Sequence, residues 1–190
     1  MSNITEIRWH GRGGQGVVTA GELLAEAAME EGKYFQAFPD YGPERMGAPI
    51  KSFTRISEAP LHIRCQIQEP DVVMVLDGTV MGVVDVTEGL KPEGVVLINT
   101  SESPRQVRQR LHLTGGQVVT IDATRIALDT IGRNIPNTPM LGALVRATGL
   151  VRMDSIIGLI EHRFGTKFPQ SVVDANIEAV NRAFEEAQIG

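Results

Sequence analysis

The sequence has little of what a metal-cluster protein, a secreted protein or a membrane protein needs. Its 190 residues include one cysteine, Cys65, which excludes an internal disulfide and the roughly four ligands of an iron–sulfur cluster or structural zinc. The first residues lack a basic stretch followed by an apolar core, and no apolar run approaches the ~18 residues of a membrane span. We therefore expect a cytoplasmic protein with no membrane association, and Cys65 as a core or strand residue rather than a nucleophile.

Positive charge is also in short supply. The chain has 18 Lys and Arg against 23 Asp and Glu, a formal net charge of -5, so no general cationic field exists to attract nucleic acid. Hydrophobic residues make up 42%, as in an average soluble globular protein, and the length suits one substantial core. Because no repeat, low-complexity tract or linker interrupts the sequence, we predict a single domain of residues 1–190.

Short β-rich runs alternate with stretches of helical periodicity, which is typical of an α/β fold. The predicted strands are residues 7–10, 34–38, 50–56, 62–67, 71–77, 95–99 and 118–122. The predicted helices are residues 17–31, 80–90, 104–111, 124–131, 140–148, 154–164 and 172–188. Near-continuous apolar runs in the last three strands indicate a parallel sheet covered on both faces. We predict a three-layer α/β/α, Rossmann-like, mostly parallel sheet with a C-terminal helical section.

A glycine-rich turn joins the first predicted strand to the first predicted helix. Gly11, Gly13 and Gly16 fit the G-x-G-x-x-G spacing, in which glycines allow a close backbone approach and the helix N-terminus offers unpaired N–H groups to an anion. Arg12 adds a charged fork suited to a phosphate or carboxylate. The candidate binding turn therefore comprises Gly11, Arg12, Gly13, Gly14, Gln15 and Gly16.

Two interpretations of this turn stay open on spacing alone. A dinucleotide site also needs an acidic residue at the end of the second strand, about 20 residues on, to hold a ribose hydroxyl. Asp40 is the only candidate, and it lies inside a Pro/Gly turn. The alternative is a purely structural turn that lets the strand and helix pack closely.

A second unusual segment is the loop Tyr41–Pro49, which contains two glycines and two prolines. Tyr41 offers a flat amphipathic ring, and Glu44 and Arg45 offer charges, so these three residues are candidate contacts with another molecule. An ordinary solvated ion pair between Glu44 and Arg45 is the alternative.

Signatures of a self-sufficient enzyme are missing. The four histidines show no H-E-x-x-H spacing, no G-x-S-x-G elbow occurs, and no Walker sequence occurs. Asp77 and Asp122 follow predicted strands, where ligands gather, but an Asp there more often caps the next helix. We predict no catalytic residue and no metal ligand on this chain.

Several segments, in order, resemble the gamma subunit of 2-oxoacid:ferredoxin oxidoreductases. They are Trp9–Val17 (WHGRGGQGV), Tyr41–Pro49 (YGPERMGAP), Asp71–Val73, Asp122–Thr124 and Asn137–Ala143 (NTPMLGA). The glycine turn alone is weak evidence, whereas its combination with the Tyr41 loop and the Asn137 segment is specific. The resemblance runs from about residue 7 to the C-terminal helix.

The resemblance implies a complex that decarboxylates a 2-oxoacid on thiamine diphosphate, reduces ferredoxin through [4Fe–4S] clusters and transfers the acyl group to coenzyme A. The sequence lacks the G-D-G motif of a thiamine diphosphate and Mg²⁺ site, and its one cysteine cannot hold a cluster. The resemblance therefore assigns those cofactors to partner subunits of alpha, beta and delta type, with pyruvate the slightly favoured substrate.

We hypothesise from this resemblance that the glycine turn forms an anion cradle for a coenzyme A phosphate, and that the Tyr41 loop is an interface. Two other functions remain open. One is a free-standing NAD(P)-binding Rossmann oxidoreductase, and the other is a purely structural scaffold subunit without a ligand.

Overall fold

The computed structural model describes residues 4–40 and 47–190, within which seven strands form one mixed sheet in the order β2-β3-β1-β4-β5-β6-β7. The strands are β1 (Ile4–Arg12), β2 (Tyr34–Pro39), β3 (Pro49–Ser57), β4 (Val72–Val75), β5 (Val95–Asn99), β6 (Gln117–Ile121) and β7 (Gln188–Ile189). Strands β1, β4, β5 and β6 run parallel in the centre, whereas β2, β3 and β7 are antiparallel to their neighbours. The predicted α/β class with a parallel core is confirmed, with antiparallel strands at both edges.

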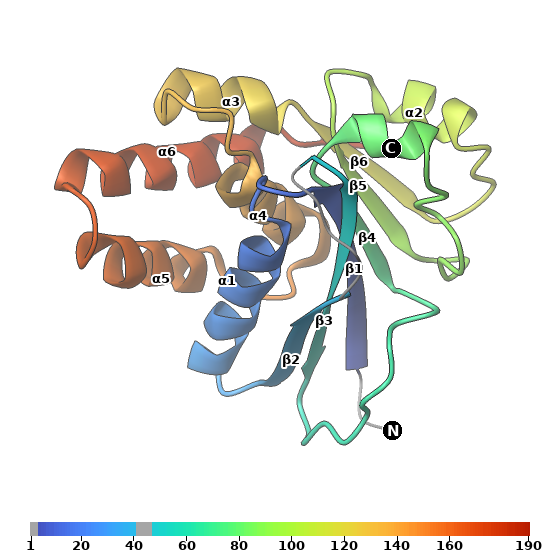
Figure 1. Cartoon of the computed structure of the whole chain (residues 1–190), viewed down its shortest axis with the longest axis horizontal. Coiled ribbons are helices and arrows are strands. Elements are labelled where there is room, and N and C mark those ends of the chain that lie inside the picture. Colours follow the sequence, from blue (N-terminus) through green and yellow to red (C-terminus); the bar gives the residue numbers. More distant parts are fainter. Residues whose placement is uncertain (1–3, 41–46) are drawn as a thin grey trace.

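Helices cover the two faces of the sheet unequally (Figure 1). They are α1 (Val17–Glu30), α2 (Pro104–Arg110), α3 (Ala123–Thr130), α4 (Asn137–Thr148), α5 (Met153–Gly165) and α6 (Gln170–Glu186), with a 3-10 helix, η1 (Gly78–Gly82). On one face α1 and α4 lie against the strands, and α3, α5 and α6 pack on them from outside. The other face carries η1 and α2, so the three predicted layers are present but one is thin.

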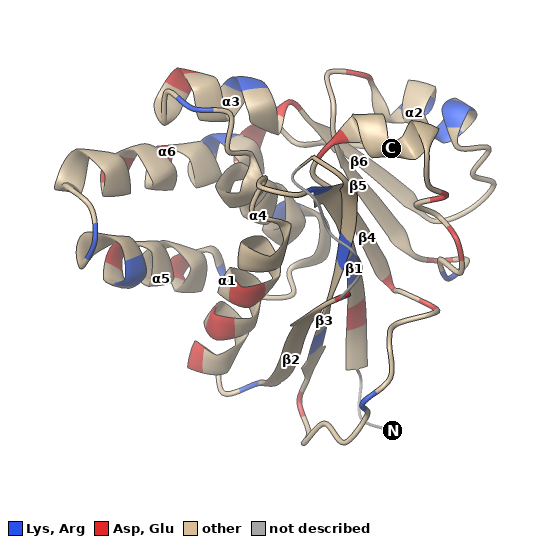
Figure 2. Cartoon of the chain, in the orientation of Figure 1, with Lys and Arg blue, Asp and Glu red and all other residues tan. Residues whose placement is uncertain are grey.

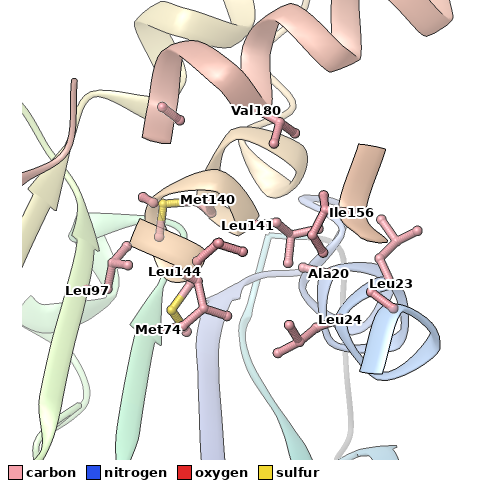
Figure 3. Close-up of a cluster of buried hydrophobic side chains, with 14 of the residues drawn as sticks. Ala20, Leu23, Leu24, Met74, Leu97, Met140, Leu141, Leu144, Ile156 and Val180 are labelled. Atoms are coloured by element: carbon pink, nitrogen blue, oxygen red, sulfur yellow. The ribbon is translucent and has the colours of Figure 1, made fainter. Parts of the chain in front are cut away.

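The alternation of side chains along β4 produces two separate cores. Val72 and Met74 point into the thick helical side, whereas Val73 and Val75 point to the thin side. Met140, Leu141 and Leu144 of α4 lie between the sheet and the neighbouring helices at the centre of the larger core (Figure 3). Burial of these apolar side chains is the main stabilising contribution, at about 1.5–3 kcal/mol for each large residue.

Helices α4 and α6 approach each other closely at Gly142. A Cβ atom at this position would overlap the carbonyl oxygen of Val180 and lie 3.2 Å from the amide nitrogen of Phe184. Val173 and Val180 of α6 are buried, and Ile177 packs against the same core. A glycine in the middle of a helix, usually destabilising, is here what lets the two backbones meet.

The predicted helix 80–90 is wrong, since only the short η1 forms in that region. Arg8 of β1 gives the reason: its guanidinium donates to the carbonyl oxygens of Val86, at 3.0 Å, and Glu88. An α-helix would use such carbonyls internally. Asp85 also accepts from the Thr87 amide at 2.9 Å, which closes a tight turn, so a buried arginine fastens an irregular crossover to the sheet.

The predicted strand 62–67 is also wrong, because the structure has no strand between β3 and β4. The segment has the two-residue period of a strand at Ile63, Cys65 and Ile67. It cannot pair with β3, because β3 already pairs with β1 on one side and β2 on the other. Cys65 consequently lies in an irregular segment and is exposed, so its predicted core or strand position is wrong as well. Its thiol lies 3.9 Å from the Arg55 guanidinium.

Acidic residues follow one another along α1 (Figure 2). On α1, Glu22 and Glu26 face Arg163 of α5, with the Arg163–Glu26 pair at 2.8 Å. Among the residues that the structure describes, no helix has the length and apolarity to cross a membrane.

Candidate functional site

The glycine turn connects β1 to α1. Gly11 and Arg12 are the last residues of β1, so the turn itself is Gly13–Gly16. Gln15 closes it, because its side-chain Oε1 accepts from the Arg12 amide at 2.8 Å and its own amide donates to the Arg12 carbonyl at 3.2 Å. The strand–turn–helix setting that the motif requires is therefore present.

Gly16, the residue before α1, has a conformation that only glycine adopts easily, with φ at 75°. A Cβ atom there would also lie 2.7 Å from Nδ2 of Asn137, so a side chain is excluded on two grounds. The first helical hydrogen bond runs from the Ala20 amide to the Gly16 carbonyl at 2.9 Å, and no side chain of the described residues caps this helix end. Amides without a partner at a helix N-terminus suit an anion.

Arg12 is held by the chain itself rather than extended into solvent. Its Nε donates to Thr79 Oγ1 at 2.9 Å, its Nη1 donates to the Gly47 carbonyl at 3.0 Å, and its Nε lies 3.6 Å from Asp77 Oδ2. The same Asp77 oxygen accepts from Gln15 Nε2 at 2.7 Å. One carboxylate after β4 therefore organises both polar side chains of the glycine turn.

Asp77 remains ionised in this arrangement. Burial by itself would raise the pKa of Asp77, but hydrogen bonds from Thr79 and Gln15, helped by the positive charge of Arg12, hold it below its usual value. Since Arg12 and Asp77 cancel each other in charge, the remaining attraction for an anion comes mainly from the N-terminus of α1.

A polar cleft of about 500 Å³ opens beside the turn, at the carboxyl ends of β4, β5 and β6. Its lining includes Gln15, Asp77, Asn99, Glu102, Arg110 and Asp122. The sheet grows in opposite directions from β1 and β4, so the cleft borders a topological switch point, where α/β proteins bind ligands.

Asp40 cannot serve as the ribose-binding acid of a dinucleotide site. β3 lies between β1 and β2, which places the end of β2 two strand spacings, roughly 10 Å, from β1. Asp40 instead accepts from Gln66 Nε2 at 2.6 Å. The strand order therefore explains why Asp40, which follows β2, does not reach the glycine turn.

The prediction that Asp77 and Asp122 cap the following helices is confirmed. Asp77 accepts from the Thr79 amide at 2.9 Å, and Asp122 accepts from the Arg125 amide at 3.0 Å. Both residues also line the polar cleft, so each one caps a helix and forms part of the cleft wall.

Sequence reasoning missed Asn99, which ties the cleft together. Its Nδ2 donates to the Leu76 carbonyl and to Thr124 Oγ1, both at 2.8 Å, and its Oδ1 accepts from the Thr124 amide at 3.1 Å. Asn99, the last residue of β5, thus links the end of β4 to the start of α3, which follows β6. The only signal in the sequence was a polar residue that ends an apolar run.

The candidate interface residues Tyr41, Glu44 and Arg45 lie outside the described residues. The adjoining end of their loop is tied to the glycine turn, because the Gly13 amide donates to the Ala48 carbonyl at 3.0 Å and the Gly47 amide donates to the Gly13 carbonyl at 3.3 Å. In residues 4–40 and 47–190, no three His, Cys, Asp or Glu side chains group as a metal site would require.

Comparison with known proteins assigns the chain to a family. The family described as pyruvate ferredoxin/flavodoxin oxidoreductase matches residues 6–186. The chain belongs to this family. A relative named pyruvate synthase subunit PorC, from Thermotoga maritima, is 50% identical over 183 residues, which cover 96% of this chain and 94% of the relative.

Two further likenesses agree with this membership. The pyruvate/ketoisovalerate oxidoreductases common subunit gamma of Pyrococcus abyssi is 50% identical over 184 residues, or 97% of each chain. The crystal structure of pyruvate oxidoreductase subunit PORC from Thermotoga maritima has a TM-score of 0.88 and 47% identity, covering 98% of each chain. The family resemblance predicted from the sequence is therefore confirmed. In this family member the glycine turn and the NTPMLGA segment meet, since Gly16 packs on Asn137.

Proposed function

We propose that this chain is a gamma subunit of a 2-oxoacid:ferredoxin oxidoreductase, inactive alone, in a complex that converts a 2-oxoacid, with pyruvate favoured, to its acyl-CoA. The observation that carries the proposal is the near full-length match to relatives named as the pyruvate synthase subunit and the common gamma subunit. We also propose that it works as one domain in the cytoplasm, where an exposed thiol such as Cys65 stays reduced.

The redox cofactors belong to partner chains in this proposal. A [4Fe–4S] cluster needs about four thiolates, and this sequence has one cysteine. Thiamine diphosphate, Mg²⁺ and the clusters would then lie on alpha, beta and delta type subunits, which also deliver electrons to ferredoxin. This chain's own contribution would be substrate binding and assembly.

Coenzyme A is the ligand that we propose for the glycine turn, through one of its phosphates. The site would comprise Gly11, Arg12, Gly13, Gly14, Gln15 and Gly16, with the uncapped N-terminus of α1 providing backbone amides. Because Asp77 already lies 3.6 Å from Arg12, a phosphate must compete with that carboxylate for the guanidinium. The bonds between Gly13 and residues 47–48 would link this site to the interface loop, with Tyr41, Glu44 and Arg45 as its contacts.

The test uses the assembled complex and two substitutions of opposite expected sign. Arg12→Ala removes the cation, and we expect it to raise the KM for coenzyme A about tenfold, the usual effect of losing one charge-assisted hydrogen bond. Asp77→Asn removes the competing charge and should lower that KM. Arg105→Gln, on an exposed position of α2, is the matched control and should leave it unchanged.

Gel filtration of each reconstituted complex separates binding from assembly. If both Arg12→Ala and Asp77→Asn complexes assemble and keep the original KM, the phosphate cradle is wrong. If Arg12→Ala alone prevents assembly, the turn is an interface element and the scaffold alternative holds.

The NAD(P) alternative makes its own prediction, that the isolated chain binds NAD(P). The position of β3 between β1 and β2 argues against it, because Asp40, the acid that follows the second strand, is then not on a strand next to β1. Fluorescence titration of the isolated chain with NADH is expected to show no saturable binding.

A further inference from the structure

A second hollow lies on the helical side of the sheet, among the segment after α3, the end of α5 and the start of α6. Its volume is about 360 Å³. We call it the apolar cavity, since most of its lining is apolar: Ile131, Ile135, Phe164, Phe168 and Val172. Phe164 and Phe168 form an edge-to-face pair with ring centroids 5.8 Å apart, and Phe168 remains 50% exposed. Such a size and lining are typical of small-molecule sites.

The apolar cavity is separate from the polar cleft, although the two share a wall. Alternate residues of the segment 133–137 line different hollows: Asn134 and Pro136 face the cleft, whereas Arg133, Ile135 and Asn137 face the cavity. A ligand in the cavity would therefore be held by residues that the glycine-turn site does not use.

Two buried asparagines line the cavity, and hydrogen bonds fix the orientation of their side-chain amides. Asn137 is 6% exposed and its Oδ1 accepts from the Thr138 amide at 2.9 Å, while Asn176 is 5% exposed and its Nδ2 donates to the Val172 carbonyl at 2.8 Å. These bonds fix both amides, which leaves Asn137 Nδ2 as a donor and Asn176 Oδ1 as an acceptor.

Neither of those two atoms has a hydrogen-bond partner among residues 4–40 and 47–190. Every side-chain nitrogen or oxygen that is sealed from solvent in this part of the chain does have one, so the two atoms are accessible. Asn137 Nδ2 lies against Gly16 of the glycine turn, so Asn176 Oδ1 is the asparagine atom that we assign to the cavity. A ligand with an amide N–H satisfies an acceptor of this kind.

Arg133 completes the site at its solvent side. It lines the cavity, its side chain is exposed, and it forms no ion pair with any residue that the structure describes. The cavity therefore combines aromatic walls, an amide acceptor and a cation.

We propose that the apolar cavity binds a small N-acyl amino acid. The aromatic or branched acyl group would pack on Phe164 and Phe168, where burial of apolar surface supplies the affinity. The amide N–H of the ligand would donate to Asn176 Oδ1, and its carboxylate would pair with Arg133. The proposal rests on the cavity alone and is independent of the coenzyme A site.

The experiment titrates N-phenylacetylglycine into the full-length chain by isothermal calorimetry, with NMR to locate the affected residues. We expect a Kd on the order of 1 mM for a ligand of this size. Arg133→Gln and Asn176→Leu should each weaken binding about fivefold or more, as expected for the loss of one polar contact. Arg105→Gln, an exposed arginine on α2 at the opposite face of the sheet, should not.

A neutral analogue, N-methylphenylacetamide, separates the charge from the amide. It should bind more weakly than the acid and be insensitive to Arg133→Gln. Phe168→Ala, at an exposed position that does not threaten folding, should weaken both ligands. Absence of saturable binding overturns the proposal, as does binding that neither Arg133→Gln nor Phe168→Ala changes; circular dichroism confirms that the variants are folded.

Discussion

At the scale of single residues, the buried polar side chains of β1 decide how stability depends on pH. His10 is 2% exposed, and its Nε2 accepts from Arg8 Nε at 3.1 Å. Burial, reinforced by the positive charges of Arg8 and Lys51, lowers the pKa of His10 to about 3. His10 is therefore neutral in the folded chain throughout the ordinary pH range, unlike a histidine in the unfolded chain, whose pKa is about 6.5.

This difference predicts that acid destabilises the fold well above the pKa of its carboxylates. Below pH ~6.5 His10 binds a proton in the unfolded chain but not in the folded chain. The free energy of unfolding therefore falls with decreasing pH by up to about 1.4 kcal/mol per pH unit. His10→Gln keeps an acceptor for Arg8 and cannot titrate, so its stability should vary less between pH ~4.5 and ~6.5.

Urea denaturation at several pH values measures this slope. His162→Gln, at an exposed position of α5, is the control and should retain the slope of the original chain. An equal slope in His10→Gln would contradict the assignment to His10. Restricting the comparison to pH above ~4.5 keeps Asp77 and Asp85 ionised, since hydrogen bonds hold both pKa values below normal.

Residues whose role is local could be predicted from the sequence, whereas residues that link distant segments could not. Asp77 and Asp122 each follow an apolar run, and capping depends only on the next few residues. Asn99 and Asn137 contact segments 25 or more residues away, so no spacing in the sequence reveals them. Arg12 was a candidate from its place in the glycine turn, but its contact with Asp77, 65 positions further along the chain, was not predictable.

At the scale of elements, the crossing of α4 and α6 depends on a missing side chain. Gly142→Ala puts a methyl group against the backbone of α6, which cannot move without disturbing its own hydrogen bonds. We expect a loss of about 3 kcal/mol, the range of overpacking in a closely packed core. Thermal unfolding of the purified variant measures it.

Gly158→Ala supplies the matched control for the same substitution in a helix. Gly158 lies within α5, and a Cβ atom there would meet nothing within 4 Å. It should raise stability by roughly 0.5–1 kcal/mol, since alanine favours the helix. Equal effects at the two positions would mean that helix propensity, rather than contact between the helices, governs Gly142.

The elements that sequence patterns predicted wrongly have a common cause. Residues 80–90 and 62–67 carry apolar residues at suggestive intervals, yet long-range contacts decide their structure. In residues 80–90, backbone carbonyls accept hydrogen bonds from Arg8 instead of from helical amides. Residues 62–67 cannot pair with β3, because β1 and β2 already occupy both of its edges. Strands β4, β5 and β6 were predictable because their continuous apolar runs match burial on both faces.

At the scale of the whole molecule, the two sides of the sheet differ in how much they bury. The thick side contains α1, α4, α5 and α6 around a large core, whereas the thin side holds a small cluster under η1, α2 and the crossover. Local opening requires less free energy where fewer apolar contacts must separate.

Hydrogen exchange should therefore be asymmetric across the sheet. We expect the amides of residues 78–94 to exchange on the order of tenfold faster than those of α4, measured by mass spectrometry on the full-length chain. Arg8→Met, which releases the crossover, should accelerate residues 83–90 further and leave α4 unchanged. Uniform protection of both sides would contradict the view that the thin layer opens separately.

The strip of residues 133–137 has a thermodynamic consequence. Because it borders both the polar cleft and the apolar cavity, and because its last residue, Asn137, touches Gly16, we expect a displacement imposed from one chamber to reach the other. Thermodynamic linkage then requires symmetry: the factor by which an occupant of one chamber changes the affinity of the other equals the factor in the reverse direction.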